Sequence, residues 1–267
     1  MEYIARYGLE FNPFLKNSRE ILVENDEFRE VRFRLNYLVD THGFGLLTGA
    51  PGLGKTTAIR TFVAGLNPSR YKVIYSSLST ITVNDFYRSL VSALGLEPRY
   101  RKPDNFQLIQ DEISRLAIEK RITPVLIIDE ANHISSAILN DLKILFNFEM
   151  DSRDRAVVLL AGQAQINNTL RLIAHEPLRQ RLVMNYNMEG LSKEEGKTYI
   201  LEKLKGAGCK QPVFDEAAIE AILNTANGIP RVINRLCDTA LLLGNATGAS
   251  VIDNELAMKA INETQLG

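Results

Sequence analysis

The segment GAPGLGKT, residues 49–56, constrains the fold of this chain more than any other. It lies between a short apolar stretch, Phe44–Leu47, and the helical pattern TAIRTFVAGL. A phosphate-binding loop needs this order of strand, loop and helix, because backbone N–H groups then face a phosphate at a helix N-terminus. A glycine-rich turn that matches by chance is the alternative, and the flanking strand and helix argue against it. The segment therefore predicts a nucleotide site.

The residue types in this loop predict its ligands. Lys55 would reach the β and γ phosphates of ATP, and the Thr56 hydroxyl would bind Mg²⁺, which neutralises charge on the transferred phosphoryl group. The residues predicted to contact the nucleotide are Gly49, Gly52, Leu53, Gly54, Lys55, Thr56 and Thr57. ATP and Mg²⁺ are the expected cofactors.

An acidic pair follows the continuous apolar run Val125–Asp129, which is typical of a strand buried on both faces of a parallel sheet. Asp129 would hold Mg²⁺ through water, and Glu130 would polarise the attacking water. Alone, such a pair more often starts a helix. A phosphate loop upstream in the same sheet favours the catalytic interpretation, since ligands of open α/β sheets bind at the carboxyl ends of strands.

Apolar runs alternate with helical patterns up to about residue 190, which predicts a doubly wound parallel sheet of five strands flanked by helices. The strands are expected at 44–47, 72–79, 125–129, 156–161 and 183–188. Helices are expected from the Thr82/Asp85 capping pattern to Leu94, from about 104 to 120, from about 136 to 150, and after Gln163.

The pattern changes after Leu191, where Ser192 and Glu195 form a capping box and no further strand signal follows. Helices are expected over roughly 192–206, 215–226 and 230–244, with a short one from about Asp253. We therefore predict an α/β domain over 1–190 and a small α-helical lid over 191–267.

Composition excludes several classes of protein. Basic and acidic residues number 31 and 32, so any contact with nucleic acid must come from a local patch. Cys209 and Cys237 lack metal-site spacing and are interpreted as packing residues. No apolar run approaches the roughly 20 residues that span a bilayer, so we expect a cytoplasmic protein without a membrane partner.

These motifs together resemble an AAA+ ATPase. The segments that carry the resemblance are GAPGLGKT, VLIIDEA, LLAGQ, LRQRL, GLSKEE and GIPRVINRLCDTALL, in order from residue 49 to about 243. More narrowly, YGLEFNPF, LAGQ and GIPRVIN resemble the ExeA group of bacterial secretion ATPases. The relatives of that group include the transposition-associated TnsC, TniB and Mu B proteins.

The resemblance implies further site residues. Gln163 would be the polar sensor of the γ phosphate, although many AAA+ proteins have Asn there. Arg181, or else Arg179, would be the arginine finger, unless both lie on a solvated helix end. Arg231 would be the second sensor, and the segment 1–40, with Phe11–Phe14, would pack beside the adenine or serve only in packing.

An arginine finger that acts on a neighbour implies a homo-oligomer, either a ring or a helical filament. Two uses are then open. One is a DNA-associated ATPase that regulates transposition by target selection or transposase activation. The other is a secretion-pathway ATPase or another remodeller, whose relatives add a membrane span and a cell-wall-binding domain. Neither follows the lid in this sequence, which we take to favour the first use.

A basic turn is the best local candidate for contact with duplex DNA. Arg99, Arg101 and Lys102 interrupt the crossover between the second and third expected strands, and Tyr100 could stack on a base or sugar. The alternative is an exposed turn neutralised by nearby acids. Nothing in this turn would contact base edges specifically, so binding is expected to be independent of DNA sequence.

Overall fold

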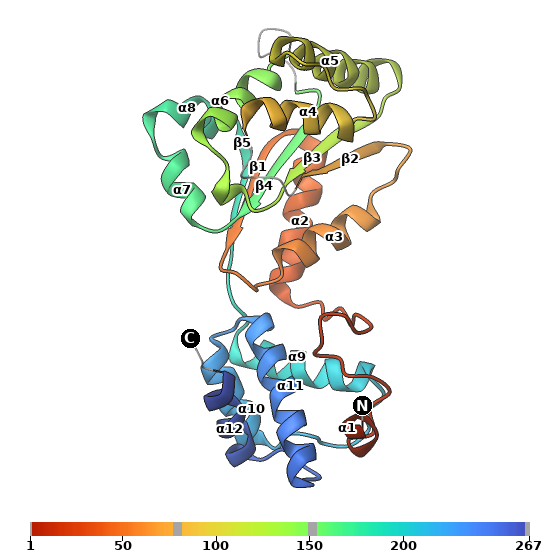
Figure 1. Ribbon diagram of the computed structural model, residues 1–267, viewed down its shortest axis with the longest axis vertical. Coiled ribbons are helices and arrows are strands. Elements are labelled where there is room, and N and C mark those ends of the chain that lie inside the picture. Colours follow the sequence, from red (N-terminus) through yellow and green to blue (C-terminus); the bar gives the residue numbers. More distant parts are fainter. Residues whose placement is uncertain (1, 77–81, 149–153, 265–267) are drawn as a thin grey trace. The chain divides into compact units, whose positions relative to one another are not determined.

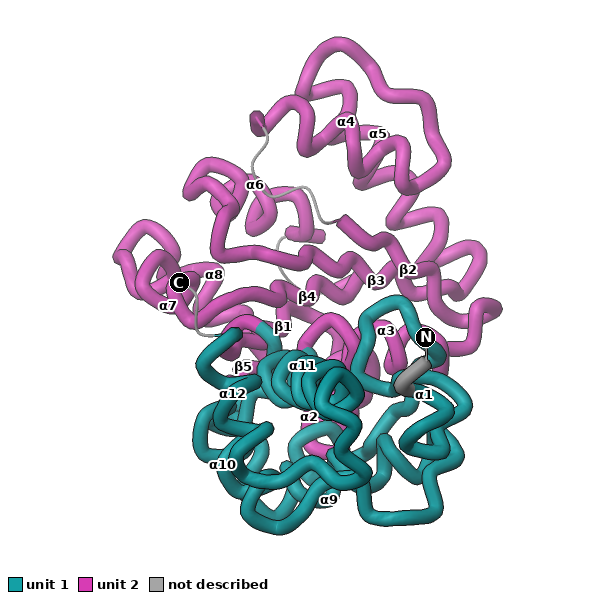
Figure 2. The backbone as a smooth tube through the Cα atoms, turned by 60° about the horizontal axis from the view of Figure 1, so that its bottom comes forward, with its two compact units in different colours: residues 1–28, 52–54, 189–267 teal, residues 29–51, 55–188 magenta. Residues whose placement is uncertain are grey.

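The computed structural model describes residues 2–76, 82–148 and 154–264. By their contacts the residues group into two compact units, drawn in different colours in Figure 2. Unit 1 comprises residues 1–28, 52–54 and 189–267, and unit 2 comprises residues 29–51 and 55–188.

Unit 2 is built on a five-stranded sheet with every pairing parallel (Figure 1). Its strands are β1 Gly43–Gly49, β2 Tyr71–Ser76, β3 Thr123–Ile128, β4 Val157–Gly162 and β5 Leu182–Met188. The spatial order is β2-β3-β4-β1-β5, so β3, β4 and β1 are central and almost wholly buried. The predicted five-stranded parallel sheet is confirmed.

Helices cover both faces of this sheet. They are α2 Asp26–Thr41, α3 Lys55–Gly65, α4 Val83–Ala93, α5 Lys102–Ser114, α6 Ser136–Leu145, α7 Gln165–Leu170 and α8 Glu176–Gln180, with short turns η1 Arg115–Glu119, η2 Ala131–His133 and η4 Ile173–His175. Side chains alternate along a strand. Phe44 and Leu46 therefore join one core cluster with α4, α5 and α6, and α2 and α3 lie on the opposite side of the sheet in Figure 1.

Several predicted boundaries differ from those observed. The helix expected to reach residue 150 ends at Leu145, because Phe146 leaves the helical conformation at φ −100°, ψ 21° and is buried in the core. The helix expected from residue 104 begins at Lys102 and closes with the wider π-helical turn η1. β2 ends at Ser76, and the remainder of the predicted strand at 77–79 lies outside the described residues.

Unit 1 contains the helices of the C-terminal part of the chain. They are α9 Lys193–Gly206, α10 Glu216–Ala226, α11 Pro230–Thr247 and α12 Asn254–Thr264, preceded at the N-terminus by α1 Glu2–Arg6. The Ser192/Glu195 capping box is present at the start of α9. Among the described helices of either unit, none is both long and apolar enough to cross a membrane. The functional boundary near residue 190 stays a prediction.

The N-terminal segment of unit 1 is held by buried polar groups. Asn12 is only 2% exposed, its Nδ2 donates to Asp238 Oδ1 at 2.6 Å, and its Oδ1 accepts from the Phe14 N–H at 2.9 Å. Nearby, the buried Lys203 ammonium donates to the Pro13 carbonyl at 2.8 Å. Burial raises the pKa of the Asp238 carboxyl, and the hydrogen bond from Asn12 opposes that shift.

We expect Asn12→Ala to lower the free energy of unfolding by about 1–3 kcal/mol, because it removes a buried donor and a buried acceptor. The Asn12 amide stabilises the ionised form of Asp238, so the penalty should grow as the pH rises from about 4 to about 7 and that carboxyl deprotonates. Denaturant unfolding of the variant and the wild type at several pH values measures this difference in the free energy of unfolding. Asn36→Ala, at an exposed position on α2, is the control. A penalty independent of pH would contradict the role of Asp238.

Candidate nucleotide-binding site

The loop 49–56 joins β1 to α3 with the geometry expected of a phosphate-binding loop. Lys55 is the first residue of α3, so the loop leads directly into a helix N-terminus, whose first N–H groups have no acceptor within the helix. Gly52 and Gly54 have φ values of +88° and +102°, which side chains strongly disfavour. The two glycines thus allow a backbone path that other residues would strain.

The Lys55 ammonium lies over its own loop. Its Nζ donates to the Gly49 carbonyl at 2.8 Å and to the Ala50 carbonyl at 3.0 Å. This places the one lysine of the loop beside the backbone groups predicted to surround the phosphates. Its contact with a nucleotide stays a prediction.

Asp129 follows the last residue of β3, is 5% exposed, and receives three hydrogen bonds. Thr56 Oγ1 donates to Asp129 Oδ2 at 2.9 Å, Tyr75 Oη donates to the same oxygen at 2.9 Å, and the Glu130 N–H donates to Oδ1 at 2.9 Å. The two residues predicted to hold Mg²⁺, Thr56 and Asp129, are therefore in direct contact. A hydroxyl and a carboxylate suit Mg²⁺, which prefers oxygen ligands.

Tyr75 was not predicted from the sequence as a site residue. It lies on β2, next to β3 in the sheet, in register with Ile127. Burial raises the pKa of Tyr75 to about 12, with further contributions from its hydrogen bond to Asp129 and the negative charges of Asp129 and Glu130. The phenol is therefore a protonated donor at neutral pH.

Glu130 has a backbone conformation that few residues other than glycine adopt. Its φ is 53° and its ψ is 36°, in the left-handed region, and it directly precedes η2. The conformation costs on the order of 1–3 kcal/mol and tends to occur at functional sites. It turns the chain at the end of β3, and the Glu130 side chain is exposed.

Asn132 links this turn to the predicted sensor. Its Oδ1 accepts from the backbone N–H of Gln163 at 2.9 Å, and a Cβ at Gly162 would lie 2.6 Å from the same oxygen. The Asn132 Nδ2 atom is buried and has no partner in the described part of the chain. Sequence reasoning missed Asn132, although its position two residues after Glu130 was a usable signal.

The two candidate arginine fingers differ in their surroundings. Arg181 is 14% exposed, and its guanidinium donates to the carbonyls of Lys143 and Phe146 at 3.0 and 2.8 Å and to Asp154 at 2.9 Å. It also lies 5.0 Å above the centre of the Phe44 ring. Within the described residues, the Arg179 guanidinium makes one hydrogen bond, from Nη1 to the Leu170 carbonyl at 2.9 Å.

Apart from residues 52–54 of the loop, the predicted nucleotide contacts in unit 1 are Arg231 and the segment that contains Phe14. Arg231 is exposed and follows Pro230 at the start of α11, and its backbone N–H donates to the Gly52 carbonyl at 3.3 Å. Phe14, in the segment expected near adenine, is buried and meets Phe214 edge to face, with ring centres 6.5 Å apart. Both nucleotide roles stay predictions.

The predicted DNA turn has a rigid base. Asn105 is fully buried, its Oδ1 accepts from the Arg99 N–H at 2.7 Å, and its Nδ2 donates to the Arg99 carbonyl at 2.9 Å. Tyr100 is 88% exposed between the exposed Arg99 and Arg101. Lys102 is different, because its ammonium pairs with Asp141 at 2.8 Å.

The cysteines occupy packing positions. Cys237 is buried in the core of unit 1, where burial raises the pKa of its thiol, and Cys209 lies at the edge of the same core. Within the described ranges, no group of three or more His, Cys, Asp or Glu side chains could hold a metal ion.

Comparison with known proteins identifies the fold around this site. Residues 39–170 match the family described as AAA domain. The chain is 32% identical over 266 residues to general secretion pathway protein A of Aeromonas hydrophila, covering 97% of this chain and 48% of that protein. The chain thus spans about half the length of this relative.

Two solved structures share the fold over nearly the whole chain. Cdc6p of Pyrobaculum aerophilum superposes with a TM-score of 0.71 at 15% identity, covering 95% of this chain and 71% of that one. Drosophila ORC bound to DNA superposes with a TM-score of 0.66 at 16% identity, covering 100% and 73%. The chain therefore has the AAA+ P-loop ATPase fold, a five-stranded parallel sheet flanked by helices, and its residues 39–170 match the AAA domain family.

Proposed function

We propose that this chain binds ATP with Mg²⁺ at residues 49–56 and hydrolyses it. The contact between Thr56 and Asp129, beside the N-terminus of α3, is the observation that carries the proposal. Thr56 and Asp129 would hold Mg²⁺. The Lys55 ammonium would exchange its hydrogen bonds to the loop carbonyls for contacts with the β and γ phosphates. Bound Mg²⁺ would neutralise charge that develops on the phosphoryl group.

Glu130 is the proposed general base. Its left-handed backbone is anchored by its own N–H on Asp129, and its side chain is free to reach solvent. A carboxylate so placed can take a proton from an attacking water. Asn132 fixes the backbone of Gln163, which supports the proposal that the Gln163 side chain senses the γ phosphate.

We expect Lys55→Ala and Glu130→Gln to separate binding from chemistry. Lys55→Ala should lose most nucleotide affinity, because it removes the charge that faces the phosphates. Glu130→Gln should bind ATP normally and hydrolyse it about 10²–10⁴ times more slowly, since an amide cannot accept the proton. Fluorescent-nucleotide binding and phosphate release measure the two effects.

Glu97→Gln is the control, because Glu97 is an exposed carboxylate on a surface turn. Rapid hydrolysis by the Glu130→Gln variant would remove Glu130 from the catalytic role. Unchanged ATP affinity in the Lys55→Ala variant would contradict the phosphate loop itself.

Arg179 is the proposed arginine finger, in preference to Arg181. The Arg181 guanidinium is engaged with two carbonyls and Asp154 of its own chain, so its release would cost several hydrogen bonds. In the described part of the chain, the Arg179 guanidinium donates one hydrogen bond, to the Leu170 carbonyl. A finger that acts on a neighbouring nucleotide implies a homo-oligomer, in a ring or a helical filament. Arg231 is proposed as the second sensor.

We expect Arg179→Ala to reduce turnover about 10³-fold or more with little change in melting temperature. Arg181→Ala should instead lower the melting temperature, because it leaves buried carbonyls unsatisfied. A mixture of Arg179→Ala with Glu130→Gln should regain activity, since some interfaces would then combine an intact finger with an intact base. Mixtures that stay inactive, or a loss of turnover confined to Arg181→Ala, would reject the assignment.

The first proposed use is in a secretion pathway. The supporting observation is the 32% identity with general secretion pathway protein A, which extends over 97% of this chain. This chain would supply the ATP-dependent part of such a protein.

The second proposed use is assembly on duplex DNA to regulate transposition, by target selection or transposase activation. The supporting observation is the exposed Tyr100 between two exposed arginines on a turn that Asn105 holds in place. The ORC structure of the same fold is described as bound to DNA. Phosphate contacts alone would make this binding independent of sequence.

We expect the pair Arg99→Ala and Arg101→Ala to flatten the salt dependence of DNA binding by about two units per bound subunit. Lys102→Ala should change it less, because Asp141 already neutralises that ammonium. Filter binding on unrelated duplexes with a non-hydrolysable ATP analogue measures the slopes. If the wild type shows no nucleotide-dependent retention on DNA at low salt, the DNA use is wrong and the secretion use remains.

A further inference from the structure

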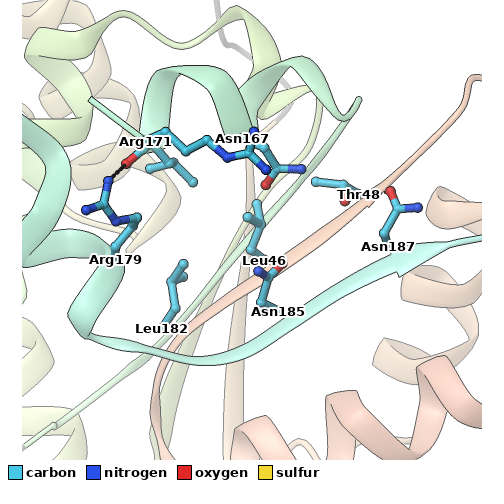
Figure 3. Close-up of a pocket in the computed structure, with 9 residues that line it drawn as sticks. Leu46, Thr48, Asn167, Arg171, Arg179, Leu182, Asn185 and Asn187 are labelled. Atoms are coloured by element: carbon cyan, nitrogen blue, oxygen red, sulfur yellow. Dashed lines mark hydrogen bonds between the residues drawn. The ribbon is translucent and has the colours of Figure 1, made fainter. Parts of the chain in front are cut away.

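A polar pocket of about 320 Å³ lies in unit 2, outside the nucleotide site. Figure 3 shows its lining side chains, which come from β1, β5 and the segment from α7 to α8. They are Leu46, Thr48, Asn167, Leu170, Arg171, Arg179, Leu182, Asn185 and Asn187. None of the residues 49–56, Asp129 or Glu130 lines this pocket.

The sheet register explains why polar groups line it. β5 pairs with β1 so that Asn185 lies beside Leu46 and Asn187 beside Thr48. Leu46 belongs to the core cluster, whereas the edge strand β5 carries asparagines at the paired positions. Thr48 Oγ1 donates to Asn187 Oδ1 at 3.0 Å. The Asn187 amide nitrogen therefore remains as a donor.

The charge of the pocket is wholly positive. Arg179 uses Nη1 for the Leu170 carbonyl and keeps the other donors of its guanidinium. The Arg171 side chain extends toward Asn167 in Figure 3, and its guanidinium has no hydrogen bond or ion pair within the described ranges. Among the described residues, no carboxylate lines the pocket. Several N–H donors thus face this pocket, and no carboxylate among the described residues that line it balances their charge.

We propose that this pocket binds an anionic small molecule, with its phosphate or carboxylate group on Arg171. Guanidinium groups match both oxyanions with pairs of parallel hydrogen bonds. The volume is in the range of small-molecule sites and exceeds what a lone oxyanion fills. The remainder of the ligand would contact the leucines of the lining and the amides of Asn185 and Asn187. The proposal does not depend on ATP binding at residues 49–56.

Nuclear magnetic resonance of the ¹⁵N-labelled full chain tests this proposal. Inorganic phosphate and glutarate are titrated separately, with the nucleotide site filled by a non-hydrolysable ATP analogue and Mg²⁺. The readouts are the Arg171 Nε–H signal and the side-chain amide signals of Asn185 and Asn187. At least one probe should shift these signals saturably. Saturation by phosphate alone indicates a phosphorylated ligand, and by glutarate alone a carboxylate ligand.

Two pocket variants and one control make the test specific. Arg171→Gln and Asn185→Ala should each weaken the saturable probe, Arg171→Gln by about tenfold or more, as the loss of a charged hydrogen bond implies. Arg171 and Asn185 are exposed, so both variants should fold. Arg88→Gln removes the same charge from exposed α4 and should have no effect. The proposal is overturned if neither probe saturates, or if Arg171→Gln and Arg88→Gln bind the probe equally.

Discussion

The carboxylate of Asp129 is the interaction on which the candidate site depends. It is buried at the end of a central strand, and it accepts hydrogen bonds from three separate parts of unit 2: the first turn of α3, the adjacent strand β2 and the turn after β3. A buried carboxylate is unfavourable unless its oxygens are satisfied, so each of these donors also fixes the position of its own element. The phosphate loop and the acidic strand end are thereby held together before any nucleotide binds.

The turn after β3 combines a strained backbone at Glu130 with a hydrogen bond that partly offsets the strain. Glu130 takes a left-handed conformation that is costly for its residue type, and its N–H on Asp129 offsets part of that cost. One residue later the chain enters η2, whose Asn132 reaches across to the end of β4. The backbones of the predicted base and the predicted sensor are therefore each held by a side chain of this region, Glu130 by Asp129 and Gln163 by Asn132.

The sequence predicted what depends on local pattern. The parallel sheet followed from apolar runs, the loop from its glycines, and the capped helices from Thr82 and Ser192. Contacts between segments that are distant in the sequence could not be predicted from these local patterns. Tyr75 reaches Asp129 because β2 lies beside β3 in the sheet. The Arg181 guanidinium is bound by Lys143, Phe146 and Asp154, which are distant from it in the sequence. The end of α6 was also predicted wrongly. The sequence continues in a helical pattern, but Phe146 is buried in the core and its backbone leaves the helical conformation.

The packing of the N-terminal segment has a consequence for synthesis. Tyr7 and Phe14 are buried against helices that begin only at residue 193, and Asn12 finds its partner at Asp238. A ribosome makes these residues well before their partners, at about 5–20 residues per second. For roughly ten seconds or more, two aromatic side chains near the start of the chain would have no native surface to cover them, while the whole of unit 2 is being completed. The native packing of the N-terminal segment can therefore form only after the helices from residue 193 onward have been made.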